Sequence, residues 1–428
     1  MPSASVFINS INAAKGILYH NNFFYIGINN NSISQYNIDG TLVRNNWATV
    51  PLNGMTDFIA YGSYMYINSA NSNNIFKVKI NSDGSADNND SSVWYDGSGT
   101  ELGLPMSMDI YENTMYISLQ QGILKTNMLT SGASANYTVL VNGLGSDCTA
   151  TDGTYLYASP GNRIVKINLT TGQIIDQNWV FFDEGAPRGI IIYDGYMYVA
   201  HYVGNPNSGF VSRINLTTKD VKLKWSIVDY EPAHYAIFSL EIYNGYLYTS
   251  SQHDGSVYRI ALPLPRSNIC FVEGTLVMTD QGIIPIETVT KDNTIFSKKV
   301  KMLTITRSFH EYLITFEKDE IAPNVPNQKI TMSKNHKVLY NGLMMDSENV
   351  GGTKVPYDGQ LLYNILLEDH GIVLANNLIC ETLDPTNVIA KLYTSEYSDT
   401  MKDAIIQKLN DTIHDMPSYK KLAIELLA

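Results

Sequence analysis

Six short apolar runs, each centred on a tyrosine, recur between Phe24 and Thr249. Their central residues are Tyr25, Tyr66, Tyr116, Tyr157, Tyr198 and Tyr248, and successive ones lie 41 or 50 positions apart. A second run follows each of them, and these second runs begin at Ile33, Ile75, Ile123, Ile164, Val211 and Val257. Apolar and polar residues alternate in both sets, which is typical of half-buried β-strands. The sequence therefore predicts one strand-rich unit repeated along the chain.

A repeat of about 40–50 residues that contains several strands is the signature of a β-propeller blade. The six copies predict that residues 1–262 form a six-bladed β-propeller. The pattern resembles propellers built from NHL-like or YVTN-like repeats, and no diagnostic motif selects one of these families. Because ring closure removes exposed strand edges, we expect Ser5–Ile11 to pair with the last blade.

Polar residues recur just before the tyrosine-centred strands, where they could line one mouth of a central channel. They are Asp57, Asp109, Asp147, Arg188 and Glu241. Such acids could hold a cation or a small ligand that the sequence does not identify. Alternatively, they hydrogen-bond to neighbouring blades, which is the commoner role of buried polar groups and the one we favour. We predict no metal site and no cofactor.

Basic residues also repeat, within the second run of five copies. They are Lys77, Lys125, Lys166, Arg213 and Arg259. We expect them on the solvated face of a strand rather than in a binding patch.

Charge and composition exclude several classes of function. A formal net charge of −12 and a pI near 5.1 argue against binding to a phosphate backbone, which needs a basic face. Cys148, Cys270 and Cys380 are too few for a disulfide scaffold. The N-terminus lacks the basic and apolar regions of a secretory signal, and no apolar run approaches the ~20 residues of a membrane helix. We expect a soluble protein synthesised inside the cell.

The propeller pattern ends at Ile260, and a connector containing Pro263 and Pro265 follows it. Two prolines so close exclude a central strand and indicate an extended linker over residues 263–269. The next residue is a cysteine, so the Ile269–Cys270 bond lies at a domain edge. A thiol in that position could attack the carbonyl that precedes it.

From Cys270 onwards the sequence resembles a Hint domain, the self-cleaving module shared by hedgehog proteins and inteins. Further positions match the start of that domain in register: Gly274, Thr275, Val277, Thr279, Gly282, Ile286 and Glu287. Ile330–Val338 resembles the family's Thr-x-x-His block, with Ser333 in place of Thr and His336 as the histidine. Tyr363–Cys380 resembles the closing strands, and the three matches come in the family's order.

The resemblance implies an all-β Hint domain, shaped like a horseshoe, over residues 270–385. It also implies an N-to-S acyl shift, with Cys270 as the nucleophile on the Ile269–Cys270 bond. His336 would be the general acid for the leaving nitrogen, and Ser333 a supporting donor that orients the carbonyl. The resulting thioester would be open to water, an amine or a hydroxyl.

The chain departs from the family in ways that restrict this expectation. Inteins end in His-Asn, whereas this chain reads Cys380-Glu381-Thr382 at the corresponding place. We therefore expect cleavage on the N-terminal side only, without splicing. Asn364 stands where many inteins carry a catalytic Asp or Cys, which we expect to slow the reaction.

Other residues of this region lie outside the matched chemistry. Cys380 could pair with Cys270 as a redox lock if the ends of the first and last strands meet. We expect His310 to be structural, and Asp369 and His370 to be solvated in a turn.

Residues 386–428 change to a helical pattern. Ser398 can cap a helix with apolar positions at Met401, Ile405, Leu409 and Ile413, and Pro417 ends it. A second amphipathic stretch follows at Tyr419–Leu427. Its mixed charges favour packing on the Hint domain or on a protein partner over a membrane-surface role. A homo-oligomer through the propeller or this tail is also open.

Two functions remain open from the sequence. The first is a propeller matured or released by Cys270-dependent self-cleavage. The alternative is a non-enzymatic structural or binding protein whose Hint domain is inactive. Propeller–Hint fusions rich in Asn, Ile and Tyr resemble proteins of large DNA viruses, and this resemblance implies a component of a virion or its surface.

Overall fold

The computed structural model describes residues 2–427 except 10, 12, 13, 29, 30, 100, 130–136, 194, 204–208, 229–236, 265, 413 and 414. Pro265 and Ile413, to which the sequence assigned a linker and a helix position, lie outside the described residues. The fold divides into two compact units, Met1–Ala261 and Leu262–Ala428. Within the described parts of both units, no helix has the length and apolar character to cross a membrane.

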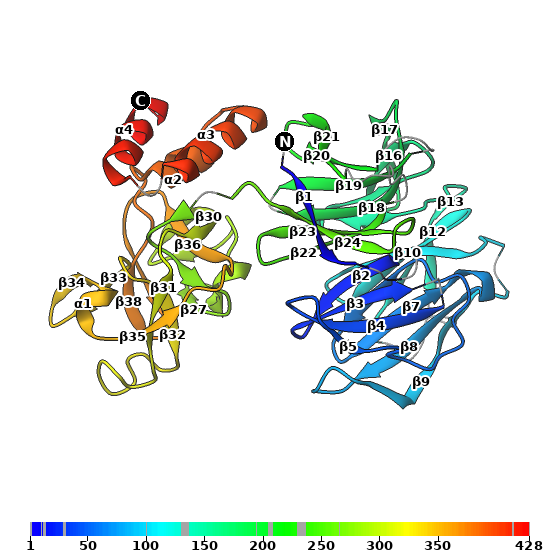
Figure 1. Cartoon of the computed structure of the whole chain (residues 1–428), viewed down its shortest axis with the longest axis horizontal. Helices are drawn as coiled ribbons and strands as arrows, with labels where there is room; N and C mark the ends of the chain where they lie inside the picture. The colour runs from blue at the N-terminus through cyan, green and yellow to red at the C-terminus, as the bar shows by residue number, and fades with distance from the viewer. Residues whose placement is uncertain are drawn as a thin grey trace. The chain divides into compact units, whose positions relative to one another are not determined.

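The described residues of the first unit form six antiparallel sheets of four strands each (Figure 1). In chain order the first three sheets contain β2 (Ala14–His20), β3 (Phe23–Ile28), β4 (Ser32–Asn37) and β5 (Leu42–Arg44); β6 (Phe58–Tyr61), β7 (Tyr64–Ser69), β8 (Asn74–Ile80) and β9 (Ala86–Asp96); and β10 (Pro105–Tyr111), β11 (Thr114–Leu119), β12 (Gly122–Asn127) and β13 (Tyr137–Asn142). The next two contain β14 (Thr149–Thr151), β15 (Tyr155–Ala158), β16 (Arg163–Asn168) and β17 (Ile174–Phe181); and β18 (Ala186–Tyr193), β19 (Tyr196–Tyr202), β20 (Phe210–Asn215) and β21 (Val221–Ile227). This arrangement confirms the predicted six-bladed β-propeller.

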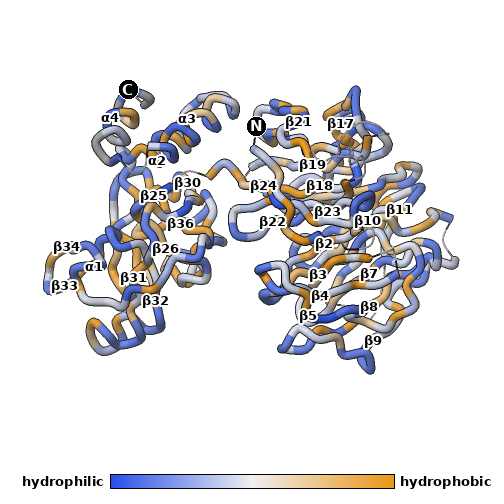
Figure 2. The backbone as a smooth tube through the Cα atoms, in the orientation of Figure 1, coloured by the Kyte–Doolittle hydropathy of each residue, from blue (hydrophilic) through white to orange (hydrophobic). Residues whose placement is uncertain are grey.

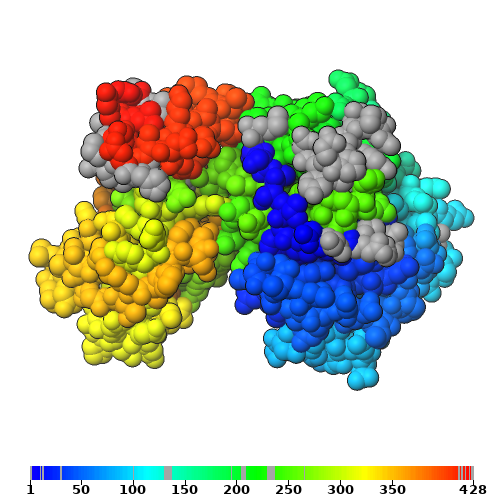
Figure 3. Space-filling view, in the orientation of Figure 1, coloured from blue at the N-terminus to red at the C-terminus, as the bar shows by residue number. Residues whose placement is uncertain are grey.

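The last blade is completed by the start of the chain. Strands β22 (Ile237–Tyr243), β23 (Tyr246–Ser251) and β24 (Ser256–Ala261) are joined by β1 (Ala4–Ile8), which pairs antiparallel with β24. In Figure 3 the dark-blue N-terminal segment lies along the green last blade. The expected closure of the ring by N-terminal residues is therefore confirmed, and β24 has no open edge.

The repeated tyrosines form part of the packing between blades. All six are buried: Tyr25, Tyr66, Tyr116, Tyr157, Tyr198 and Tyr248. In four blades a tryptophan packs against the tyrosine ring with centroids 4.8–5.2 Å apart, in the pairs Tyr25–Trp47, Tyr66–Trp94, Tyr157–Trp179 and Tyr198–Trp225. Apolar residues are concentrated along the strands and polar ones in the turns (Figure 2).

Four of the five repeated basic residues, all except Lys125, lie over tyrosine rings. Lys77 lies 3.8 Å from the ring centroid of Tyr64, and Lys166 lies 3.7 Å from that of Tyr155. Arg213 lies over a tyrosine in the same way and is only 3% exposed, so the expectation of a solvated side chain is wrong for this residue. These cation–π contacts add to the burial of apolar surface in the blades that contain them.

The second unit contains two sheets. The eight-stranded sheet is ordered β25 (Arg266–Ser267), β30 (Lys298–Ser308), β36 (Leu362–Leu367), β26 (Phe271–Val272), β32 (Ile330–Ser333), β31 (Tyr312–Phe316) and β35 (Thr353–Pro356), with β29 (Thr294–Ile295) paired to β30. The six-stranded sheet is ordered β28 (Gly282–Pro285), β27 (Leu276–Thr279), β37 (Ile372–Ala375), β38 (Leu378–Glu381), β33 (Lys337–Tyr340) and β34 (Leu343–Asp346). One short helix, α1 (Ser347–Val350), follows β34.

Three helices follow these sheets: α2 (Val388–Thr394), α3 (Asp399–Asp411) and α4 (Met416–Leu427). The side chain of Ser398 accepts the backbone N–H of Met401, which confirms the predicted cap. Tyr419 packs edge-on against Phe309 with ring centroids 5.1 Å apart. The helices are therefore packed on the sheet region of the second unit, as the first of the two alternatives predicted.

Candidate functional site

Strand β26 brings the residues of the Ile269–Cys270 bond into the centre of the eight-stranded sheet. Phe271, directly after Cys270, pairs with Met332 of β32 on one side and with Tyr363 of β36 on the other. Ser333 ends β32, and Asn364 follows Tyr363 in β36. The peptide bond is therefore flanked by side chains that are far from it in sequence.

Both ends of the Ile269–Cys270 peptide are held by side chains. The N–H of Cys270 donates to Oγ of Ser333 at 2.6 Å. The carbonyl oxygen of Ile269 accepts from Nδ2 of Asn364 at 2.8 Å and from Oγ of Ser267 at 3.3 Å. Ser333 thus contacts the nitrogen side of the bond, whereas the sequence predicted that it would orient the carbonyl. Asn364, expected only to slow the reaction, occupies that place.

The thiol of Cys270 is fully buried. Its Sγ lies 2.9 Å from Oγ1 of Thr306, a residue of β30. Burial raises the pKa of Cys270 to about 11, and hydrogen bonds from Ser267 and Thr306 offset part of this rise. The thiol form therefore dominates at neutral pH. Sequence reasoning did not identify Ser267 or Thr306, because their proximity depends on the pairing of β25 and β30 with the rest of the sheet.

His336 is also fully buried, and its ring lies 4.1 Å from that of Phe271. Its Nε2 is 3.0 Å from the carbonyl oxygen of Glu381, which can only accept, so Nε2 carries the proton. Among the described residues, Nδ1 has no hydrogen-bond partner. Burial lowers the pKa of His336 to about 4, against smaller opposing contributions from the backbone of Glu381 and of Cys270. The imidazole is therefore neutral, and the backbone of Cys270 lies close to it.

Cys380 and His310 have surroundings separate from those of Cys270 and His336. Cys380 is a free, buried thiol in β38 of the six-stranded sheet, and its Sγ contacts the carbonyl of Leu378 at 3.5 Å. A redox lock between Cys380 and Cys270 stays a prediction, because both are free thiols here. His310 contacts Oδ1 of Asn335 at 3.0 Å.

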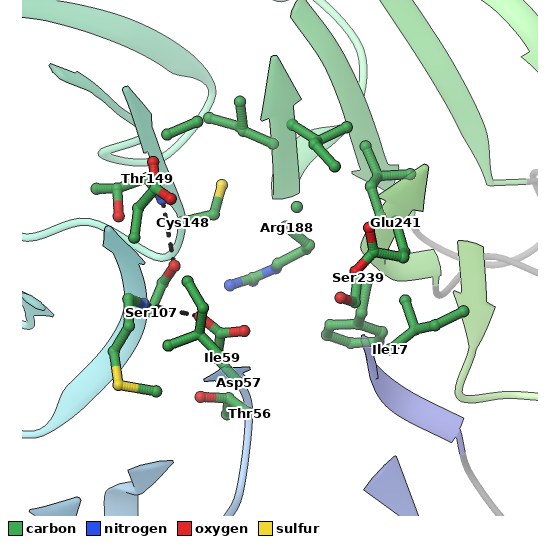
Figure 4. Close-up of a pocket in the computed structure, with 18 of the residues that line it drawn as sticks. Ile17, Thr56, Asp57, Ile59, Ser107, Cys148, Thr149, Arg188, Ser239 and Glu241 are labelled. Atoms are coloured by element: carbon green, nitrogen blue, oxygen red, sulfur yellow. Dashed lines mark hydrogen bonds between the residues drawn. The ribbon is translucent and has the colours of Figure 1, made fainter. Parts of the chain in front are cut away.

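All five polar residues predicted for the propeller channel line one cavity of about 300 Å³. Residues from all six inner strands contribute to its wall. The side chain of Arg188 projects into the space between Ser107 and Glu241 (Figure 4). It forms an ion pair with Asp147, with Nη1 and Oδ2 2.6 Å apart.

Three of the channel acids connect neighbouring blades. Asp57 accepts the N–H of Met108 at 2.7 Å, and Asp109 accepts that of Thr151 at 2.6 Å. Glu241 of the last blade accepts the N–H of Tyr19 in the first blade at 3.0 Å. Burial raises the pKa of Asp57 to about 6 and those of Asp109 and Glu241 to about 7. These contacts agree with the structural role that the sequence favoured for the acids.

Comparison with known proteins gives one family match. Residues 269–387 match the family model of the Hint domain. The resemblance read from the sequence blocks is thereby confirmed for this part of the chain. The fold is mainly β: a six-bladed propeller, a Hint domain and small C-terminal helices. No curated protein sequence matches the chain.

Several solved structures resemble the chain at low identity. The WD40 domain of Pan2 from Neurospora crassa is 8% identical over 60% of this chain and 95% of that one, with a TM-score of 0.42. Virginiamycin B lyase from Staphylococcus aureus is 12% identical over 60% and 98%, with a TM-score of 0.43. A glucose dehydrogenase is 10% identical over 61% and 99%, with a TM-score of 0.46. The activities in these names belong to those proteins and are not transferred to this chain.

Proposed function

We propose that this chain cleaves itself at the Ile269–Cys270 bond and thereby releases or matures its propeller. The observation that carries the proposal is the pair of side chains on the two ends of that peptide. Asn364 donates to the carbonyl oxygen of Ile269, and Ser333 accepts the N–H of Cys270. The attacking thiol belongs to Cys270 itself. The match of residues 269–387 to the Hint domain supports this assignment.

The first step is an N-to-S acyl shift. The thiol proton of Cys270 passes to Nδ1 of His336, and Sγ attacks the carbonyl carbon of Ile269. Negative charge develops on the carbonyl oxygen, where Asn364 and Ser267 donate hydrogen bonds. The C–N bond then breaks, and the proton on Nδ1 moves to the leaving nitrogen. The products are a thioester between Ile269 and Cys270 and a free amino group on Cys270.

In this mechanism His336 is a base before it is an acid. Its pKa of about 4 makes the neutral imidazole a weak base toward the thiol, and makes the protonated ring a strong acid toward the leaving nitrogen. The resting thiol, whose pKa burial raises to about 11, supplies the proton. The difference between the two pKa values predicts slow cleavage.

Denaturing electrophoresis of the wild-type chain beside Cys270→Ala tests the proposal. Cleavage after 269 of the 428 residues of a 47.7-kDa chain gives fragments of about 30 and 18 kDa. We expect both fragments in the wild type, increased by an added thiol, and neither in Cys270→Ala. Intact chain in both proteins, even with added thiol, would contradict self-cleavage.

The alternative is a binding or structural protein with an inactive Hint domain. The raised pKa of Cys270 and the cavity of about 300 Å³ in the propeller favour it. It predicts a single full-length species in the same experiment, together with a small ligand or a protein partner for the propeller. Association with a virion stays a prediction from resemblance, and mass spectrometry of purified particles would test it.

A further inference from the structure

A surface pocket of about 390 Å³ adjoins the residues on the N-terminal side of the proposed cleavage point. Asn268 and Ile269 line it, so the pocket reaches the residue whose carbonyl would form the thioester. The remaining charged or titratable lining residues are Lys337, Asp346, His370, Glu381 and Asp384. Such a polar lining suits water and disfavours a large apolar alcohol, whose burial there would desolvate these charges.

Within this pocket His370 is paired with a carboxylate. Its Nε2 lies 3.7 Å from Oε2 of Glu381, while the other carboxylate oxygen, Oε1, accepts the N–H of Lys337 at 3.0 Å. The side chain of Glu381 is 8% exposed and therefore fixed, whereas that of His370 is 46% exposed and accessible to water. A carboxylate beside an imidazole stabilises the imidazolium that forms when the ring accepts a proton.

The surroundings of the pair are acidic. Burial raises the pKa of Glu381, and the hydrogen bond from the backbone N–H of Lys337 opposes this rise, with smaller electrostatic contributions from Lys337 and His370. The pKa of Asp384 is lowered mainly by its hydrogen bonds with Thr386, and the charge of His370 adds to that effect. Asp346 also lines the pocket, and Nζ of Lys298 donates to the backbone carbonyl of His370 at 3.3 Å.

We infer that His370 is the general base that activates water to resolve the thioester, so the propeller leaves with a free carboxylate at Ile269. This inference rests on the proposed self-cleavage. Water adds to the carbonyl carbon of Ile269 as the free imidazole nitrogen of His370 accepts one of its protons. The C–S bond breaks, Sγ of Cys270 leaves as a thiolate, and the thiolate then takes a proton. Hydrolysis consumes one water and needs no other reactant.

His370 thus has a chemical role beyond that of a solvated side chain. Its exposed position in a turn favoured a solvated side chain without chemistry. A base that serves water must reach solvent, so exposure beside the scissile residue is compatible with this role. Neither Glu381 nor Asp384 is close to His370 in sequence, which explains why the sequence did not group them.

The test compares the full-length wild type, His370→Gln and Asp369→Asn. Asp369 is an exposed neighbour in the same turn that does not line the pocket, so its variant is the matched control. Two rates are measured for each protein: spontaneous cleavage in buffer made with ¹⁸O-water, and cleavage driven by added dithiothreitol. The second rate reports formation of the thioester without help from His370, and it also shows that each variant is folded.

We expect His370→Gln to lower spontaneous hydrolysis by about 100-fold and to leave thiol-driven cleavage unchanged. Asp369→Asn should match the wild type in both rates, and the wild-type propeller fragment should carry ¹⁸O at Ile269. Unchanged hydrolysis in His370→Gln, or a propeller fragment joined to an amine or alcohol, overturns the role of His370 while self-cleavage stands. Absence of thiol-driven cleavage in the wild type overturns the proposed function and this inference together.

Discussion

The side-chain amide of Asn364 lies 2.8 Å from the carbonyl oxygen of Ile269, a contact between residues 95 positions apart. Oδ1 of the same side chain accepts the N–H of Ile365 at 2.8 Å, so the amide group must present Nδ2 to the carbonyl. Asn364 is buried, and the contact is therefore shielded from water. These features make it a fixed donor at the place where charge would develop during attack by Cys270.

Replacing Asn364 by alanine removes this donor. We expect thiol-driven cleavage to slow by about 10²–10³-fold, which is the usual effect of losing one oxyanion donor. The rate at which the two fragments appear after addition of thiol measures this cleavage. Asn377→Gly is the control, because Asn377 is half-buried in the turn after β37, its φ of 65° suits glycine, and its side chain bonds to the carbonyl of Asn324 instead of the site. A rate for Asn364→Ala equal to that of the control would show that Asn364 has no part in the chemistry.

The sequence could predict some site residues and not others for a physical reason. Ser333 and His336 belong to one contiguous block whose residues match a family pattern. The position of Asn364 depends instead on the register of β26 against β36, where Phe271 faces Tyr363. A shift of one residue in that register would turn Asn364 away from the peptide. Sequence alone does not determine such pairings.

Ser333 is expected to contribute to both stability and cleavage. Ser333→Ala leaves the N–H of Cys270 without its partner in a buried place, which should cost about 1–3 kcal/mol in the free energy of unfolding. Ser333→Thr keeps the hydroxyl and restores the residue of the family's block. We therefore expect it to retain cleavage and most of the stability. Urea denaturation and fragment yield measure the two effects, and equal behaviour of both variants would contradict the assignment.

The Hint domain should become less stable as the pH falls from 6.5 to 4. The folded state holds the pKa of His336 at about 4, below the 6.5 of an unfolded histidine. Between these two pH values the unfolded chain binds a proton that the folded chain does not. The free energy of unfolding therefore falls by up to about 1.4 kcal/mol for each pH unit of acidification. Hydrogen exchange of amides in β32 and β33, in a Cys270→Ala background, measures this. In His336→Gln, protection of these amides should depend less on pH. A pH dependence equal to that of the parent protein would show that another group causes it.

The stability of the inner strands of the propeller, which contain the channel acids, should depend on pH in the opposite direction. The folded pKa values of Asp57, Asp109 and Glu241, about 6 to 7, exceed those of free carboxyl groups. These groups therefore stabilise the fold below pH 4, and this stabilisation is lost as the pH rises to 7. His201, whose pKa burial lowers to about 4, opposes the three acids. Amide hydrogen exchange in β10 and β14 measures the net effect of the three acids and His201 on local stability.

Asp109→Asn provides the matched variant for that measurement. It removes one titrating group and keeps an oxygen that can accept the N–H of Thr151. We expect the protection of β10 and β14 to depend less on pH between 4 and 7. A dependence equal to that of the wild type would exclude Asp109 as a contributor.

The architecture of the propeller was predictable because its repeat is expressed in every blade. The tyrosine-centred strands predicted both the blade number and the buried positions. The tryptophans were harder to recognise, because they follow the third strand at varying distances and occur in four blades only. Their packing depends on loop lengths that differ from blade to blade, which a search for a fixed period does not detect.

Two of these tryptophans differ in the hydrogen bonding of their indole N–H groups. Trp47 and Trp225 each lie with ring centroids 5.2 Å from a blade tyrosine. Nε1 of Trp47 donates to the carbonyl of Gly84 at 2.7 Å, whereas that of Trp225 has no partner among the described residues. Phenylalanine at either position leaves a comparable cavity, but only Trp47→Phe also loses a hydrogen bond. We expect Trp47→Phe to be the more destabilising by about 1 kcal/mol. Urea unfolding followed by tyrosine fluorescence measures the difference, and a larger loss for Trp225→Phe would mean that its indole N–H is bonded in solution.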